Sequence, residues 1–269
     1  IALYQQSLEL KERIGDVQGK AATLHQLAGI YAQQGQVEEA IALYQQSLEL
    51  KERIGDVQGK AATLHQLAGI YAQQGQVEEA IARYQQSLEI KERIGDVQGK
   101  AATLHQLAGI YAQQGQVEEA IARYQQSLEI KERIGDVQGK AATLHQLAMI
   151  YAQQGQVDEA IARYQQSLEI DERIGNVQGK AITLANMGQL LADQRGEFDT
   201  AIAYLQESLA ILQHLKSPNA QTVQEMLIQV IFNKIAQSPN SEAFQQALQS
   251  GDQEAILGFI QEAMPRPDG

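Results

Sequence analysis

The chain has 269 residues, a net charge of −12, and neither Trp nor Cys. The acidic excess disfavours nucleic acid and anionic membranes as partners, and the lack of cysteine excludes a disulfide framework and favours a reducing, cytoplasmic setting. No apolar run approaches the roughly 18–20 residues that a membrane-spanning helix requires.

A block of forty residues fills positions 1–40 and returns unchanged at 41–80. It recurs with two substitutions at 81–120, and the copy at 121–160 adds Met149 and Asp158 to these. A fixed period of this length indicates one supersecondary unit stacked on itself, with each copy burying its apolar face against its neighbours. The repeat therefore predicts an extended array rather than a single round core.

The array begins with an incomplete copy. Residues 1–16 predict only the second helix of a repeat, because no first helix precedes it. Ile1, Tyr4 and Leu8 then lack half of their packing partners and form an exposed apolar edge. We expect this edge to be either a site of self-association or the trace of a missing upstream segment.

Residues 17–216 predict five repeats of about 40 residues, each a pair of antiparallel helices. In one copy, Gly55 ends a helix and Asp56 caps the next. The helix capped by Asp56 is the first helix of the repeat. Its apolar residues follow the helical period at Val57, Ala61, Leu64, Leu67, Ala68 and Tyr71, and it runs to about Gln74. Gly75 separates it from the second helix, which starts near Val77. Nothing in the repeat has the alternation of a strand.

The second helix of the repeat has an apolar stripe and a polar back. The predicted stripe comprises Val77, Ala80, Ile81, Tyr84, Ser87, Leu88 and Ile94, and the predicted polar face comprises Gln85, Gln86, Lys91 and Arg93. Mixed charges such as those at 89–93 are typical of a solvated face with weak ion pairing. The alternative is a contact site on the convex side of the array.

The last part of the chain departs from the repeat. From Asp171 onward the copies change, and after Leu215 the pattern predicts a helix over 217–236, a short helix to about Leu248 and a final helix to about Ala263. We expect 217–264 to be a helical cap, because a terminal layer faces water on one side. The alternative is a connector to another domain. Residues 265–269 are expected to be a mobile tail.

The repeat resembles the tetratricopeptide repeat (TPR) family. The family pattern of large and small packing residues is met by Leu64, Leu67, Ala68, Tyr71, Ala80, Tyr84 and Ser87. The usual period of that family is 34 residues. The longer period here is similar to that of the subgroup with Pins-type adaptors, kinesin light chains and bacterial TPR signalling proteins. The resemblance implies an all-α fold, a right-handed α-solenoid of antiparallel helix pairs that forms a superhelix.

In that family the first helix of each pair lines a concave groove that binds a protein or an extended or helical peptide. The resemblance implies a groove lined here by His65, Gln66, Gly69, Gln73, His105, Gln106, Gly109, Gln113, His145, Gln146, Met149, Gln153, Asn186 and Gln189. The Lys, Arg and Asn set with which chaperone-binding members hold a terminal carboxylate is missing from these positions. Only Asn186 is similar to the groove Asn of Pins-type adaptors. The resemblance therefore supplies the groove and not the ligand.

One histidine per repeat, at 25, 65, 105 and 145, could suggest a metal site or a pH sensor. Packed helices lie roughly 8–10 Å apart, whereas metal ligands lie about 2 Å from their ion, so one metal cannot bridge two rows. We expect no metal site and interpret each histidine as a groove residue bonded to Gln or water, with a tuning role for protonation left open. The glutamine rows either contact a ligand or form a solvated face. Gly69 and its copies indicate a close approach, of a ligand or of a neighbouring helix.

Catalytic signatures are missing from the sequence, which has no Gly-rich phosphate loop, no HExxH motif and no nucleophile elbow. The predicted function is therefore a non-enzymatic scaffold that binds a protein or peptide and needs no cofactor. One alternative is a structural spacer or an array that assembles end to end. Another is a regulatory module of a larger signalling protein.

Overall fold

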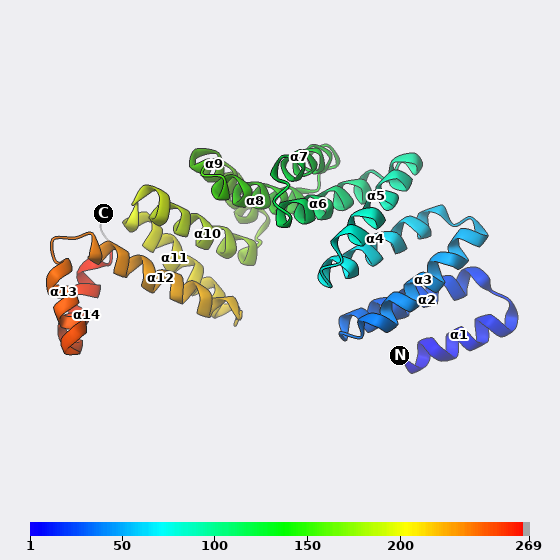
Figure 1. Cartoon of the computed structure of the whole chain (residues 1–269), viewed down its shortest axis with the longest axis horizontal. Helices are drawn as coiled ribbons and strands as arrows, with labels where there is room; N and C mark the ends of the chain where they lie inside the picture. Colours follow the sequence, from blue (N-terminus) through cyan, green and yellow to red (C-terminus); the bar gives the residue numbers. More distant parts are fainter. Residues whose placement is uncertain (266–269) are drawn as a thin grey trace. The chain divides into compact units, whose positions relative to one another are not determined.

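The computed structural model describes residues 1–265, and all regular secondary structure within that range is α-helical (Figure 1). Residues 266–269 lie outside the described residues, and with them all but the first residue of the predicted tail. The described helices are α1 (Ala2–Ile14), α2 (Val17–Gln33), α3 (Val37–Ile54), α4 (Val57–Gln73), α5 (Val77–Ile94), α6 (Val97–Gln113), α7 (Val117–Ile134), α8 (Val137–Gln153), α9 (Val157–Ile174), α10 (Val177–Arg195), α11 (Phe198–His214), α12 (Asn219–Ala236), α13 (Ser241–Ser250) and α14 (Gln253–Ala263). The predicted all-α fold is confirmed.

The chain divides into two compact units, residues 1–135 with α1–α7 and residues 136–269 with α8–α14. In the first unit, first and second helices pack in the consecutive pairs α2–α3, α4–α5 and α6–α7, and α1 packs on α2. Figure 1 shows α2 and α3 side by side, joined by a short turn. Consecutive helix pairs of this kind make an α-solenoid.

Local signals start and end the helices where the sequence predicts. Gly55 closes α3 in the left-handed conformation, with φ 72°, and Asp56 accepts a hydrogen bond from the backbone N–H of Gly59 at 2.8 Å. A Cβ on Gly59 would lie 2.0 Å from Oδ2 of Asp56, so this glycine makes room for the cap. The same carboxylate cap recurs at Asp16, Asp96 and Asp136.

Small residues let the paired helices approach closely. Ala68 and Ala80 are fully buried, and the larger Leu64 fills the space between the helices. Ser87 is buried as well and donates a hydrogen bond to the carbonyl of Ala61 at 2.8 Å, which fixes α5 on α4. Because each pair repeats these contacts, the stability of the unit is close to a sum over repeats and their interfaces.

The predicted surface of the second helix is wrong at two positions. Lys91 is only 6% exposed, and Ile94, assigned to the buried stripe, is 40% exposed. The ammonium group of Lys91 donates to Oγ1 of Thr103 at 2.8 Å and to the carbonyl of Gly99 at 3.3 Å, both on α6. Its alkyl stem therefore fills apolar space while its charge reaches polar groups of the next repeat, a contact that the pattern of one helix cannot reveal.

In the second unit, α8–α9 and α10–α11 form two further pairs, and α12 packs on α11. One core runs through these helices and includes the fully buried Ile202 and Val230. At its end, Phe244 of α13 makes edge-to-face contacts with Phe232 of α12 and Phe259 of α14. These aromatic contacts hold the two shortest of the last helices on α12.

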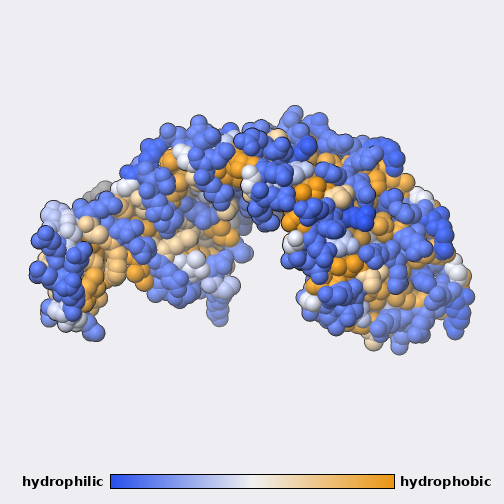
Figure 2. Space-filling view, in the orientation of Figure 1, coloured by the Kyte–Doolittle hydropathy of each residue, from blue (hydrophilic) through white to orange (hydrophobic). Residues whose placement is uncertain are grey.

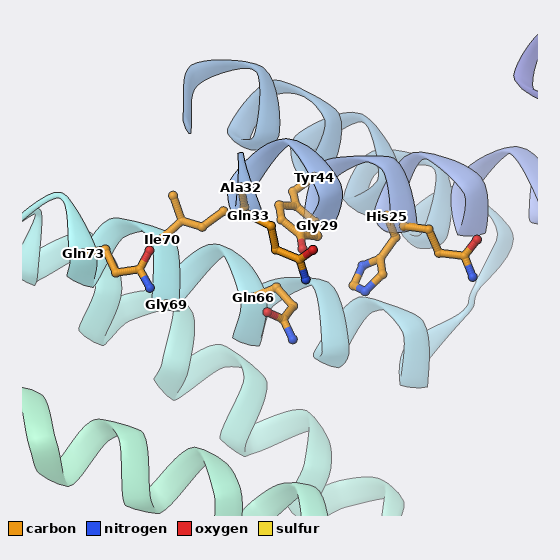
Figure 3. Close-up of a pocket in the computed structure, with 10 residues that line it drawn as sticks. His25, Gly29, Ala32, Gln33, Tyr44, Gln66, Gly69, Ile70 and Gln73 are labelled. Atoms are coloured by element: carbon orange, nitrogen blue, oxygen red, sulfur yellow. The ribbon is translucent and has the colours of Figure 1, made fainter. Parts of the chain in front are cut away.

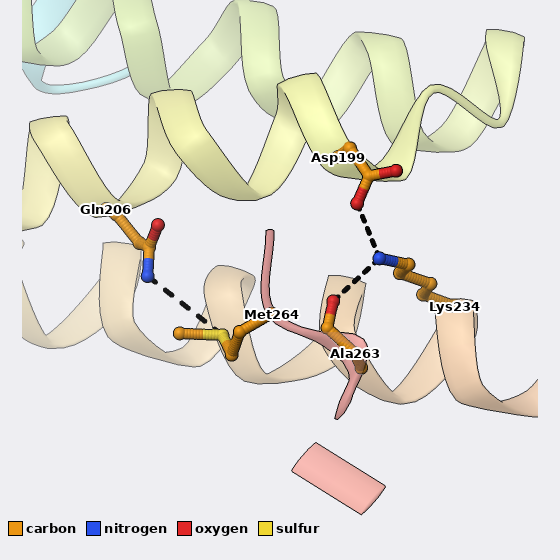
Figure 4. Close-up of polar contacts among 5 residues, drawn as sticks. All are labelled: Asp199, Gln206, Lys234, Ala263 and Met264. Carbon is orange, nitrogen blue, oxygen red and sulfur yellow. Dashed lines mark hydrogen bonds and ion pairs between the residues drawn. The ribbon is translucent and has the colours of Figure 1, made fainter. Parts of the chain in front are cut away.

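A polar contact also ties the last helix to the array. Lys234 of α12 donates to the carboxylate of Asp199, at the start of α11, and to the carbonyl of Ala263 at 2.7 Å (Figure 4). Gln206 of α11 lies 4.0 Å from the sulfur of Met264, which follows α14. Lys234 thus satisfies a carbonyl at the end of α14 that the helix itself leaves unpaired.

On the face shown in Figure 2, orange hydrophobic groups lie between blue hydrophilic ones over α1–α5. Within residues 1–265, none of the helices combines the length and the apolar character needed to cross a membrane.

Candidate functional site

Two hollows of nearly equal size lie between successive first helices of the first unit. The first hollow, of about 410 Å³, lies between α2 and α4, and the second, of about 400 Å³, between α4 and α6. Figure 3 shows His25 and Gln33 from α2, with Gln66 and Gln73 from α4, around the first hollow. The first is lined by His25, Gln26, Gly29, Ala32, Gln33, Tyr44, Gln66, Gly69, Ile70 and Gln73. The second is lined by His65, Gln66, Gly69, Ala72, Gln73, Tyr84, Gln106, Gly109, Ile110 and Gln113.

Most of the residues predicted to line the groove in this unit meet around the second hollow. They are His65, Gln66, Gly69, Gln73, Gln106, Gly109 and Gln113. Gln66 and Gln73 line both hollows, because α4 lies between the two. His105 occupies the same repeat position on α6 as His65 does on α4.

In the second unit a smaller hollow of about 280 Å³ lies between α8 and α10. The predicted residues Met149, Gln153, Asn186 and Gln189 line it, together with Tyr164 of α9. His145 hydrogen-bonds to α10, as described below, and Gln146 is half-buried on α8. Met149 replaces the glycine of the first three copies, Gly29, Gly69 and Gly109, and its side chain lines this hollow.

The histidines at 25, 65 and 145 each bond to a threonine of the next repeat. Nδ1 of His25 lies 3.0 Å from Oγ1 of Thr63, and Nδ1 of His65 lies 3.1 Å from Oγ1 of Thr103. The expected partner, a glutamine or water, is therefore wrong for this nitrogen. The threonine is separated from its histidine by 38 residues, and the sequence gives no local signal for the pair.

The threonine hydroxyl fixes the tautomer of the imidazole. Oγ1 of Thr63 donates its one proton to the carbonyl of Gly59 at 2.9 Å, and it accepts a hydrogen bond from Lys51 at 2.8 Å. Its second lone pair is then left for the histidine, and this arrangement of donors assigns the proton to Nδ1 of His25. Nε2 of His25 is therefore an acceptor. The same three bonds around Thr103 give His65 the same tautomer.

The first two hollows are uncharged at neutral pH. Burial and the nearby charge of Lys51 lower the pKa of His25 to about 4, and burial with the charge of Lys91 does the same for His65. Burial raises the pKa of Tyr84 to about 12. Burial also raises the pKa of Tyr44 in the first hollow, and the remaining lining residues are Gln, Ala, Gly and Ile. The surface therefore offers neutral hydrogen-bonding groups and no fixed charge.

A buried tyrosine lines each of these three hollows, so the predicted core position of Tyr84 is confirmed and the residue also borders the surface. Tyr84 is 3% exposed, yet it lines the second hollow and stacks edge-to-face on His65, with ring centroids 5.1 Å apart. A Cβ on Gly69 would lie 3.4 Å from the Tyr84 hydroxyl. The neighbouring helix thus approaches this glycine closely, as the glycine inside the helix predicts, but it still leaves room for a Cβ.

Met149 changes this contact in the fourth copy. The rings of His145 and Tyr164 are 5.4 Å apart at 64°, compared with 5.1 Å and 73° for His65 and Tyr84. Among residues 1–265 there is no group of three or more His, Asp or Glu side chains that could hold a metal ion.

The fold and the repeated hollows define a helix-pair solenoid with polar hollows between its first helices. Residues 1–53, 59–133 and 139–214 match the sequence pattern of the tetratricopeptide repeat, and the chain therefore belongs to the tetratricopeptide repeat family. No curated protein matched the chain in sequence.

Solved structures show the same fold. BtubC (BKLC) from P. vanneervenii has a TM-score of 0.71 at 22% identity, over 80% of this chain and 90% of that one. A protein from Podosopora anserina, described as a kinesin light chain with nearly identical TPR-like repeats, has a TM-score of 0.51 at 27% identity, over 80% and 94%. A Rap protein solved in complex with competence and sporulation factor has a TM-score of 0.65 at 15% identity, over 91% and 74%.

Proposed function

We propose that this chain is a non-enzymatic scaffold that binds a protein or peptide along the hollows between its first helices. The observation that carries the proposal is that consecutive repeats present the same lining residues around hollows of about 410 and 400 Å³. A polypeptide ligand has a repeating backbone, so it can occupy several equal sites at regular intervals. A compact small molecule can occupy only one of them. The Rap protein gives a precedent within the fold, because it was solved with a bound factor.

The size and polarity of the hollows agree with this function. The volumes of the first two hollows lie within the range of roughly 300–1,000 Å³ that is typical of ligand sites. Gln66, Gln73 and Gln113 are exposed on the first helices and offer both amide donors and acceptors. A cytoplasmic setting is part of the proposal and rests on the cysteine-free composition.

A displayed library of random peptides, selected on the array, tests the proposal. Selected peptides should bind Gln73→Glu/Gln113→Glu at least tenfold more weakly, because the new charges lie in the hollows. The matched control is Gln46→Glu/Gln86→Glu, the same chemical change on exposed positions of second helices. Peptides that bind all three proteins equally would refute the groove. Thermal unfolding of the variants should stay close to that of the wild type, since all four positions are exposed.

Self-association through α1 is a second candidate. None of the residues of α1 is buried, and Leu3 and Ile14 are 80% and 65% exposed. Of the predicted edge, Ile1 is exposed, and Tyr4 and Leu8 are half-buried. Light scattering over a range of concentrations should show dimers that Leu3→Lys removes. A wild-type chain that stays monomeric at high concentration rules this candidate out.

A further inference from the structure

The first two hollows each contain one hydrogen-bond acceptor that the protein leaves open. Since Nδ1 of His25 and His65 donates to a threonine, the acceptor in each ring is Nε2. Within residues 1–265 these two Nε2 atoms have no hydrogen-bond partner, and they are not buried. A ligand that donates a hydrogen bond would satisfy them.

The second unit shows which group fits such an acceptor. Nδ2 of Asn186 lies 3.1 Å from Nε2 of His145, while Nδ1 of His145 contacts Thr183 at 3.0 Å. Asn186 occupies the repeat position of Gln66 and Gln106, which make no such bond to His25 and His65. In the fourth copy, the chain's own carboxamide, that of Asn186, therefore occupies the acceptor Nε2 of the histidine. The corresponding acceptor is open in the first two copies.

Charged groups fit these hollows poorly. A carboxylate would place its oxygens against the lone pair of Nε2, and the imidazole stays neutral because burial holds the pKa of His25 and His65 at about 4. A cation would be repelled by the ammonium groups of Lys51 and Lys91, which do not line the hollows but lie close enough to lower those pKa values. An uncharged donor meets neither penalty.

We infer that the hollows select an extended, uncharged polypeptide segment whose Asn or Gln side chains donate their amide N–H groups to Nε2 of His25 and His65. The acceptor oxygens of the same amides can bond to the exposed glutamines beside them, such as Gln66. This inference rests on the proposed function, since it names the chemistry of the ligand for the same surface.

Nitrogen NMR of the histidine rings tests the first step without any ligand. Long-range correlation spectra of the intact chain should show a protonated Nδ1 and an unprotonated Nε2 for His25 and His65 at neutral pH. Protonation of Nε2 instead would overturn the inference, because the ring would then present a donor to the hollow.

Three short, capped peptides test the second step. In the first, Asn alternates with Thr, and in the other two each Asn is replaced by Asp or by Leu, which have nearly the same size. The Asn peptide should bind at least tenfold more tightly than the Asp peptide and about fivefold more tightly than the Leu peptide, the effect expected of about one net hydrogen bond. An Asp peptide that binds as tightly as the Asn peptide overturns the inference.

Two variants change the open acceptors without removing a histidine. Gln66→Asn/Gln106→Asn should supply internal donors to His25 and His65, as Asn186 does for His145, and should weaken binding of the Asn peptide about fivefold more than binding of the Leu peptide. Asn186→Gln is the matched reverse change and should strengthen binding of the Asn peptide. If the Asn peptide binds the wild type, Gln66→Asn/Gln106→Asn and Asn186→Gln with equal affinity, the inference is overturned.

The two proposals fail in different ways. If all three peptides bind equally and Gln73→Glu/Gln113→Glu weakens them all, the groove function stands and amide selection is wrong. If neither these peptides nor any from the random library bind, both proposals are wrong.

Discussion

Replacing Thr103 by valine should destabilise the contact between the second and third full repeats. The hydroxyl of Thr103 accepts from Lys91 at 2.8 Å, bonds to His65 at 3.1 Å and donates to the carbonyl of Gly99 at 2.9 Å. Valine keeps the shape and removes all three bonds. A hydrogen bond to a charged group contributes about 1.5–3 kcal/mol and a neutral one about 1 kcal/mol, so we expect a loss of roughly 3 kcal/mol.

Thr183→Val is the matched control within the same chain. Thr183 also bonds to a histidine, His145, at 3.0 Å, but Asp171 stands where the other copies have the lysine. The control therefore loses no bond to an ammonium group and should cost only about 1 kcal/mol. Native-state hydrogen exchange of amides in α6 and α10 gives the local free energy of opening at each site. A cost for Thr183→Val equal to that of Thr103→Val would refute this account of the network.

Three further outcomes follow from the same contacts. The pKa of His65 is about 4 in the folded chain and 6.5 in the unfolded one, so the unfolded state binds more protons between these values. The free energy of unfolding should fall by roughly 3 kcal/mol per such imidazole as the pH drops from about 6.5 to 4, and urea midpoints that fall equally in wild type and His65→Gln contradict this. Asn176→Asp should lower the free energy of unfolding by about 2 kcal/mol, because it places a second carboxylate beside the buried carboxylate of Asp171. In the wild type, the amide of Asn176 donates a hydrogen bond to Asp171 at 2.8 Å. Adding Asp171→Lys should restore the melting temperature, since it recreates the pairing of the other copies, and a double variant no more stable than the single one argues otherwise. Gly69→Ala should raise stability by up to about 1 kcal/mol, because its Cβ has room, whereas Gly59→Ala should lower it by about 1 kcal/mol by displacing the N-cap; thermal unfolding of both variants decides, and a loss in Gly69→Ala counts against the packing described for it.

Local signals made much of the fold predictable. The helix end at Gly55 and the cap at Asp56 depend on contacts within three residues, so the sequence around them contains the whole cause. The repeat itself predicts which residues share one surface, because identical copies must place identical side chains alike. For this reason Gln66, Gly69 and Gln73 could be named before the hollows that they line were seen.

Distant contacts made the rest unpredictable. The pattern of α5 alone predicts Lys91 as a surface charge. Only the packing of α6 on α5 shows that Lys91 is buried and donates a hydrogen bond to Thr103. Tyr84 fits a core position, and only the packing of α5 on α4 shows that it also lines the second hollow. In both cases the partner lies on another helix. Helical periodicity predicts which face of a helix is buried, but it does not predict which residues pack against that face.

The sequence by itself determined the helix pairs, their caps and the residues of the repeated surface, because these depend on neighbours along the chain and on the period of forty. Only the tertiary structure decided the chemistry of that surface. The threonine that fixes the tautomer of each histidine lies 38 residues away, in the next repeat. Stacking one repeat on the next therefore turns His25 and His65 from titratable side chains into neutral hydrogen-bond acceptors, because burial removes their charge and the threonine orients their rings.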